Sequence, residues 1–197
     1  MPMNKNEIKE FFDKYASSWD DEMIRDDNII ANILNVAQVK KGDSILDVAT
    51  GTGVLIPDYL KREVSLITGI DISDEMIKIA KSKFDKYENV HFVVGDGEEY
   101  DFKDETFDHI IIYNAFPHFN NPEKLLQNLT RFLNNNGTFV IAHGMSKEDI
   151  NNHHKGAAKH ISNMLIPAKE LAKFLSNYLN VKMVIDSDYY LVMGRKL

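Results

Sequence analysis

The stretch Ser44-Ile-Leu-Asp-Val-Ala-Thr-Gly-Thr-Gly53 is the part of this chain that indicates its fold most directly. It begins as an apolar strand, carries Asp47 near the strand end and continues into the turn Gly51-Thr-Gly53. A helical pattern follows from Val54. Glycines in a turn between a strand and a helix remove the side chains that would keep a nucleotide-like ligand away from the backbone. The stretch therefore predicts a cofactor site at the end of a buried strand.

The spacing of the glycines distinguishes between two kinds of cofactor. A dinucleotide-binding loop has the form G-x-G-x-x-G, whereas Gly51 and Gly53 are followed by three bulky apolar residues. The order of Asp47, Gly51 and Gly53 resembles motif I of the class I S-adenosylmethionine-dependent methyltransferases. That family most often has glycine where this chain has Ala49, a change to another small residue. The resemblance implies that S-adenosylmethionine binds at these four positions.

The composition limits the kinds of partner that this protein can have. The chain of 197 residues, with 44% hydrophobic and 27% charged residues, is typical of one globular domain. It has no cysteine, which excludes disulfides, zinc-thiolate sites and thiol nucleophiles. The sequence shows no apolar signal core and no run of membrane-spanning length, so we expect a cytoplasmic protein without a membrane partner. The net charge of -7 disfavours nucleic acid as a partner and favours a small-molecule acceptor.

Strand-like and helix-like segments alternate through the middle of the chain. The predicted strands are residues 44–49, 66–72, 90–95, 107–115 and 137–143, and the predicted helices between them are 54–62, 74–87 and 122–133. Such alternation indicates an α/β fold with a parallel sheet covered on both faces. Two further strand patterns, 181–186 and 189–195, are joined by a very short turn and predict an antiparallel hairpin. Together they resemble the Rossmann-like three-layer sandwich of class I methyltransferases, with a seven-stranded, mostly parallel sheet.

The same resemblance suggests how a single methyltransferase domain would be organised over residues 1–197. Residues 1–40 would form an N-terminal helical lid, and residues 44–143 would form the cofactor-binding core. Residues 144–167 would be a histidine-rich insert on the substrate side, followed by a terminal helix and the hairpin in residues 168–197.

Polar residues stand at the ends of the later predicted strands. Asp71 follows the glycine turn by about 20 residues, the spacing of an acid that accepts hydrogen bonds from ribose hydroxyls, in NAD enzymes as well. By resemblance to the family, Asp96 would bind the adenine amine and Asn114 would lie near the methionine part of the cofactor. The remaining expected cofactor contacts are Ile72, Met76 and Gly97. Taken alone, each of these acids could instead cap a helix or stabilise a turn. Their order along the chain, with one acid at each strand end, favours the cofactor site.

The segment from Glu10 to Asp20 resembles the helical lead of many small-molecule methyltransferases. Phe11, Tyr15 and Trp19 recur at every fourth residue and would form one aromatic stripe on a helix. We expect Tyr15 and Trp19 to lie over the cofactor, where a lid would exclude water from methyl transfer. The alternative is a stripe that packs the helix onto the sheet.

The predicted insert is rich in histidine. A capping-box-like start at Ser146 predicts a helix from about residue 147 to 161, with His153, His154 and His160 on the same side as apolar residues. We expect this helix to face the acceptor.

Three histidines are the candidate catalytic residues, namely His118, His143 and His154. One of them could be a general base, because the histidine pKa lies close to working pH. Several histidines could instead hold a metal ion, or could simply line a polar pocket. No metal ligands are assigned, and many methyltransferases of this fold need no base because positioning supplies most of the rate.

The sequence thus predicts methyl transfer from S-adenosylmethionine to a small molecule, with release of S-adenosylhomocysteine. Two alternatives stay open at this point. One is a regulatory module that binds the cofactor or a metal without turnover, and the other is an NAD-type oxidoreductase. The acceptor atom is also open, because function depends on the site and not on the fold.

Overall fold

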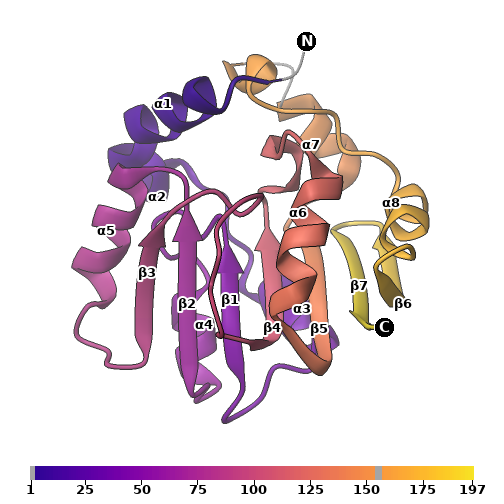
Figure 1. Cartoon of the computed structure of the whole chain (residues 1–197). Helices are drawn as coiled ribbons and strands as arrows, with labels where there is room; N and C mark the ends of the chain where they lie inside the picture. Colours follow the sequence, from indigo (N-terminus) through magenta and orange to yellow (C-terminus); the bar gives the residue numbers. More distant parts are fainter. Residues whose placement is uncertain (1–2, 154–156) are drawn as a thin grey trace.

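The computed structural model describes residues 3–153 and 157–197 and contains one seven-stranded sheet (Figure 1). The strand order is β3-β2-β1-β4-β5-β7-β6. Only β7 runs against its neighbours, so the expected parallel sheet with an antiparallel hairpin is confirmed. The strands are β1 Ser44–Val48, β2 Leu66–Asp71, β3 Val90–Val94, β4 Phe107–Tyr113, β5 Leu133–His143, β6 Leu179–Asp186 and β7 Tyr190–Lys196.

Helices cover both faces of this sheet. The larger ones are α1 Lys5–Tyr15, α3 Asp27–Val36, α4 Ile56–Lys61, α5 Asp74–Phe84, α6 Pro122–Leu129, α7 Lys147–His153 and α8 Ala168–Leu175. The short ones are α2 Trp19–Glu22 and the 3-10 turns η1 Ala16–Ser18, η2 Phe116–His118, η3 Thr130–Phe132 and η4 Ala157–His160.

Consecutive residues of the central strands enter two separate hydrophobic cores. Ile110 and Ile112 pack with α6 and α8 on one face, whereas Ile111 packs with α3, α4 and α5 on the other. Side chains alternate across a strand, so an unbroken apolar run is needed where both faces are covered. Figure 1 shows the two layers, with α6 and α8 in front of the sheet and α3 and α4 behind it.

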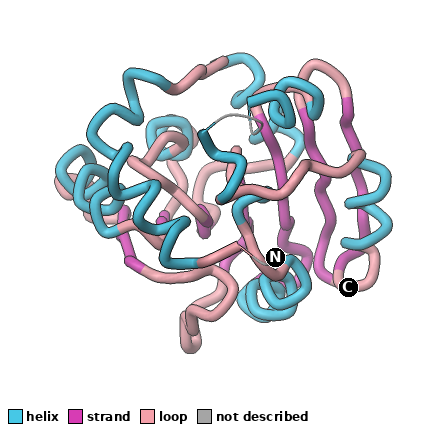
Figure 2. Tube along the Cα trace, turned by 90° about the horizontal axis from the view of Figure 1, so that it is seen from above, coloured by secondary structure: helices cyan, strands magenta, loops and turns pink. Residues whose placement is uncertain are grey.

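The strand order reverses between β1 and β4, and ligands of open α/β sheets bind outside the strand ends at such a point. Figure 1 shows α1 above the upper edge of the sheet, toward which the arrows of β1 to β4 point. The view from above shows helices and loops lying over this edge (Figure 2). Within the described residues, no helix combines the length and apolar content required to cross a membrane.

The structure corrects the helix that we expected over residues 147–161. Its described part ends at His153, and Ala157–His160 is a separate 3-10 turn. The Asn151 side chain bonds both backbone groups of Leu165, at 3.0 and 2.7 Å, so the later chain folds back against α7. This contact joins residues 14 positions apart, so a local helical pattern could not have predicted it.

The strand that we expected at residues 137–143 begins earlier in the structure, because β5 starts at Leu133. Asn134 Nδ2 donates to the Asp108 carboxylate at 2.9 Å, which ties the start of β5 to β4. The pairing register shifts between Phe107 and His109, and Asn136 has a positive φ of 65°. This irregularity takes up the asparagine run without ending the strand.

Candidate active site

A cavity with about 1050 Å³ of empty space, part of it open to solvent, lies at the carboxyl ends of β1, β2, β3 and β4. It brings together most of the residues that the sequence singled out: Trp19, Asp47, Ala49, Gly51, Asp71, Ile72, Met76, Asp96, Gly97, Asn114 and His118. Tyr15, Gly53 and His143 are not part of its lining. His154 lies outside the described residues.

The glycine turn forms one wall of this cavity. Ala49 and Gly51 both have left-handed backbone, with φ of 56° and 55°. Gly51 faces the cavity, and a Cβ added there would lie 3.9 Å from Trp19 Nε1. Gly53 has a different purpose, because a Cβ there would lie 2.7 Å from the Phe84 ring. Gly53 thus allows α5 to pack closely against the turn. This contact lies outside the cavity lining.

Asp47 supports the turn from inside the protein. Its carboxyl group accepts hydrogen bonds from Thr50 Oγ1 at 2.6 Å and from Tyr59 Oη at 3.1 Å. Burial raises the pKa of Asp47 to about 7. Asp47 therefore has a local role in the structure, because it holds Thr50 of the glycine turn.

Asp71, the last residue of β2, lines the cavity and links β2 to the glycine turn that follows β1. One carboxylate oxygen accepts from the Gly51 N–H at 2.8 Å, and the other accepts from the Ser73 N–H at 2.9 Å. Burial raises the pKa of Asp71 to about 6, against the effect of these backbone donors. The two bonds fix the carboxylate in one orientation at the position expected of a ribose acceptor.

The end of the cavity beside Asp96 contains a cluster of charged side chains that the sequence analysis did not predict. Asp96 accepts from the Glu98 N–H at 2.9 Å and forms an ion pair with Lys5. Lys5 Nζ also lies 3.0 Å from a carboxylate oxygen of Glu98, whose side chain is only 2% exposed. Burial lowers the pKa of Lys5, but its hydrogen bonds to Asp96 and Glu98 outweigh this effect and raise it. Both Lys5 and Glu98 line the cavity.

The N-terminal segment reaches the cavity through a different aromatic set from the expected one. The helix α1 ends at Tyr15 and η1 follows, so the expected stripe is interrupted before Trp19. Tyr15 packs on Phe11, with ring centroids 4.6 Å apart, outside the cavity lining. Phe12 and Trp19 line the cavity instead, with ring centroids 5.5 Å apart.

The histidine candidates lie in different environments. The His118 ring faces the cavity from η2, its Nδ1 lies 2.9 Å from the Ile161 carbonyl oxygen, and its edge contacts Phe12 at 5.1 Å between centroids. His143 is buried within β5 and packs against Tyr190, away from the cavity. In residues 3–153 and 157–197 no group of three or more His, Asp or Glu side chains is arranged so that it could hold a metal ion.

Comparison with known proteins places this arrangement in a family. Residues 46–141, which contain the glycine turn and the acids at the strand ends, match the family model of the methyltransferase domain. The chain belongs to the class I S-adenosylmethionine-dependent methyltransferases. Its cofactor is therefore S-adenosylmethionine, as the resemblance of the glycine turn to motif I implied.

Two curated relatives match most of this chain. The methyltransferase is 27% identical over 179 residues to an uncharacterized protein of Methanocaldococcus jannaschii, covering 89% of this chain and 77% of that protein. It is 31% identical over 150 residues to the demethylmenaquinone methyltransferase of Staphylococcus aureus strain JH9, covering 70% of this chain and 60% of that enzyme. The match therefore spans less than two thirds of that enzyme's length.

Two solved structures share the fold over nearly the whole methyltransferase chain. One is the putative methyltransferase of Haloferax volcanii in complex with the Trm112 activator, with a TM-score of 0.81, 22% identity and coverage of 96% and 97%. The other is the N-methyltransferase NodS of Bradyrhizobium japonicum in complex with S-adenosylhomocysteine, with a TM-score of 0.75, 13% identity and coverage of 96% and 98%.

The groups in the cavity suit the chemistry of this cofactor. S-Adenosylmethionine offers ribose hydroxyls and an adenine amine as hydrogen-bond donors, and the carboxylates of Asp71 and Asp96 are acceptors. A side chain at Gly51 would project toward Trp19 and Met76, so the glycine keeps this part of the cavity open. The methyltransferase thus has acceptors and open space where a nucleoside needs them.

Proposed function

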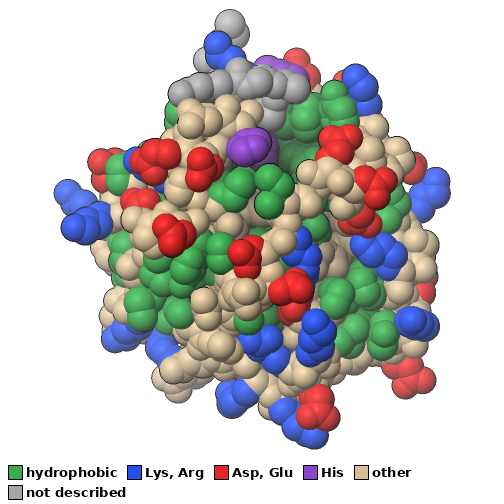
Figure 3. Space-filling view, turned by 180° about the vertical axis from the view of Figure 1, so that it is seen from behind, with side chains coloured by type: hydrophobic (Ala, Val, Ile, Leu, Met, Phe, Trp, Pro, Cys, Tyr) green, Lys and Arg blue, Asp and Glu red, His purple; other side chains and the backbone are tan. Residues whose placement is uncertain are grey.

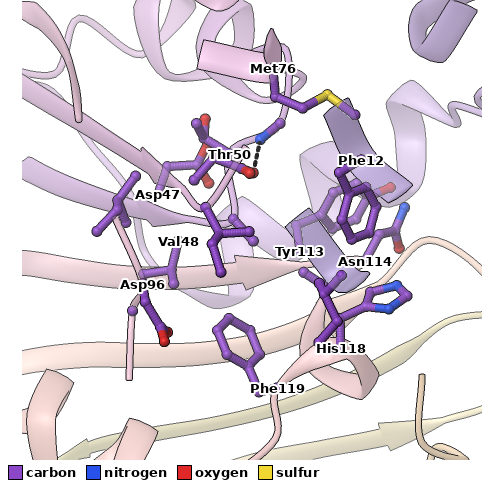
Figure 4. A pocket seen from close by; sticks show the side chains of 18 of the residues that line it. Phe12, Asp47, Val48, Thr50, Met76, Asp96, Tyr113, Asn114, His118 and Phe119 are labelled. Carbon is purple, nitrogen blue, oxygen red and sulfur yellow. Dashed lines mark hydrogen bonds between the residues drawn. The ribbon is translucent and has the colours of Figure 1, made fainter. Parts of the chain in front are cut away.

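We propose that this methyltransferase transfers the methyl group of S-adenosylmethionine to a small-molecule acceptor bound beside His118. The observation that carries the proposal is the layout of the cavity. Asp96 and His118 lie on opposite sides of it, with Phe12, Tyr113 and Asn114 on the His118 side (Figure 4). A nucleoside held by Asp71 and Asp96 would leave the His118 side for the acceptor. Seen from behind, the upper surface is hollowed beside a histidine and has hydrophobic side chains in the hollow (Figure 3).

The orientation of His118 fits it to act as a general base. The Ile161 carbonyl can only accept a hydrogen bond, so Nδ1 carries the proton of the neutral ring and Nε2 carries the lone pair. In the reaction, an acceptor atom forms a bond to the methyl carbon while the carbon–sulfur bond breaks and its electron pair stays on sulfur. The acceptor then loses a proton, which Nε2 of His118 can take.

The walls of the proposed acceptor end favour an uncharged, planar acceptor. Phe12 provides an aromatic contact there, with its ring centroid 5.1 Å from that of His118, and Lys5, the lysine that lines the described cavity, lies at the other end against Asp96. A hydroxyl on an aromatic ring would supply both a stacking surface and a proton for His118. The match to a demethylmenaquinone methyltransferase, although partial in length, supports a planar ring as the acceptor, because a quinone is such a ring.

The proposal also assigns roles to the N-terminal segment and to the insert after β5. Residues 1–40 would cover the cofactor, and residues 144–167 would cover the acceptor through the contact of Ile161 with His118. We further expect the enzyme to work in the cytoplasm without nucleic-acid or membrane partners.

The test is release of S-adenosylhomocysteine over a panel of hydroxylated aromatic, amine and thiol acceptors, with and without EDTA. The proposal expects turnover with at least one hydroxylated aromatic compound and no effect of EDTA. Cofactor binding with no turnover on any acceptor would favour the regulatory module instead. Loss of turnover with EDTA would favour a metal-dependent site.

A further inference from the structure

Lys5 joins the N-terminal helix to the adenine end of the cavity. It is the first residue of α1, and its ammonium group lies against three carboxylates, those of Asp96, Glu98 and Glu99. The helix start has a second tie to the cavity, because Asn120 Nδ2 donates to the Met3 carbonyl oxygen at 2.5 Å. The beginning of α1 is thus fastened across this end of the cavity.

We propose that Lys5 is a cofactor-positioning residue, which holds Asp96 for the adenine amine and closes α1 over the bound cofactor. The proposal rests on the cofactor site described above and adds a residue to it from outside the family-matched segment, residues 46–141. It concerns binding of the nucleoside and does not depend on which acceptor is methylated.

The arrangement of hydrogen bonds on Asp96 supports this role. One carboxylate oxygen of Asp96 accepts the Glu98 N–H, and the other contacts Lys5. A carboxylate oxygen has two lone pairs, so the oxygen that meets Lys5 can also accept from an amine. With both oxygens engaged by the protein, the carboxylate cannot rotate away from the adenine position.

The burial of Glu98 explains why a cation is needed here. Its side chain is 2% exposed, and one of its oxygens accepts the Asn121 N–H at 2.7 Å. A buried carboxylate without a cation beside it is costly. Lys5 supplies this cation, because its ammonium group contacts both Glu98 and Asp96 and so allows the two carboxylates to lie side by side at this end of the cavity.

The experiment is calorimetric titration of the full chain with S-adenosylhomocysteine, comparing wild type with Lys5→Met and Lys5→Arg. Lys9→Met is the matched control. Lys9 lies on the same helix and pairs with Asp13 at 2.7 Å and Asp74 at 2.5 Å, but it does not line the cavity. Lys5→Met should raise Kd about tenfold, the effect of one charge-assisted hydrogen bond. Lys5→Arg should stay within about threefold of wild type, since it retains the charge, and Lys9→Met should do the same.

Two results would overturn the proposal. Tighter binding by Lys5→Met would mean that Lys5 must leave for adenine to enter, and unchanged binding would mean that it only secures the helix. If wild type itself failed to bind S-adenosylhomocysteine, the cofactor site would fail and not Lys5 alone.

A second pair of variants, Glu98→Gln with and without Lys5→Met, keeps the test valid if Lys5→Met folds poorly. Glu98→Gln removes the buried charge that Lys5→Met would leave without a cation, but keeps an oxygen for the Asn121 N–H. The variant that carries both changes should still bind S-adenosylhomocysteine more weakly than Glu98→Gln alone, because Asp96 has lost its contact with Lys5. Equal affinity of the two would contradict a positioning role.

Discussion

At the scale of single residues, the acids of the cavity each make a local bond and still face the cofactor space. Asp71 caps backbone N–H groups of Gly51 and Ser73, and Asp96 caps that of Glu98. The structural and functional interpretations of these acids are therefore compatible, because the local bonds orient the carboxylates that we propose as acceptors for the cofactor.

Asp71→Ala should weaken binding of S-adenosylmethionine by about 1–3 kcal/mol, because it removes charge-assisted hydrogen bonds to the ribose. Calorimetry of the variant measures this directly. The control is Asp188→Ala, an exposed acid in the turn of the terminal hairpin, which should bind like wild type. Equal affinity of Asp71→Ala and wild type would remove Asp71 from the cofactor site.

Cofactor affinity should also depend on pH through Asp71, whose pKa of about 6 in the free protein is raised by burial. Ribose hydroxyls donate to the ionised carboxylate, so protonation of Asp71 opposes binding. Affinity should fall as pH drops below about 6 and become constant above it. Titrations between pH 5 and pH 8 with wild type and Asp71→Asn test this, and a slope that survives in Asp71→Asn would assign the effect to another group.

His118→Gln should lower turnover by a factor of about 10² to 10⁴ if His118 removes the acceptor proton. Cofactor affinity should change little, since His118 lies across the cavity from Asp96 (Figure 4). His153→Gln is the control, because His153 is exposed and bonds the Asp149 carbonyl on its own helix. Full activity of His118→Gln would exclude the general base.

At the scale of elements, the glycine turn shows how backbone conformation limits the sequence. Ala49 has φ of 56°, a region that glycine adopts freely and β-branched residues avoid. Ala49→Val should therefore lower both stability and cofactor affinity, whereas Ala49→Gly should keep both within about 1 kcal/mol of wild type. Thermal melting and calorimetry of the two variants check this. Normal binding by Ala49→Val would show that the turn adapts.

On the proposed acceptor side, hydrogen bonds join Asn163 to the segment around η2, although the two are far apart in sequence. The Asn163 N–H donates to the Pro117 carbonyl at 2.8 Å, and Asn163 Nδ2 donates to that of Phe119 at 3.3 Å. These bonds flank the one from His118 to Ile161 and hold the later part of the insert against η2.

Asn163→Ala should reduce kcat and shift its pH profile, because His118 loses part of its support, while S-adenosylhomocysteine affinity stays unchanged. The control is Met164→Ala, at a neighbouring side chain that is 56% exposed. A weaker affinity for the cofactor product with normal kcat would contradict a role on the acceptor side.

The sequence predicted the site residues that follow a local pattern and missed those that depend on how distant elements pack. Gly51, Asp71 and Asp96 follow predicted strands, and strand ends meet at one edge of a parallel sheet, so local patterns were sufficient. Lys5 and Phe12 reach the cavity only because α1 docks across it, which no local pattern encodes. Tyr15 was expected over the cofactor but lies outside the cavity lining, because α1 presents Ile8 and Phe12 to the cavity and packs Tyr15 against Phe11.

At the scale of the whole molecule, the hydrophobic cores that stabilise the fold and the cavity occupy different parts of the sheet. The two hydrophobic cores lie on either side of the sheet, whereas the cavity occupies the edge where strand order reverses. The alternation of strands and helices predicted this architecture, because apolar periodicity reports directly on buried faces. The insert was less predictable, since Asn151 and Asn163 hold it by polar contacts that leave no periodic pattern.

The most direct test of the whole account is parallel calorimetric titration of the protein with S-adenosylhomocysteine and with NAD. The account predicts one-site binding of S-adenosylhomocysteine at micromolar concentration and no binding of NAD, because the turn around Gly51 and Gly53 has no third glycine. Binding of NAD, or no binding of S-adenosylhomocysteine, would contradict it.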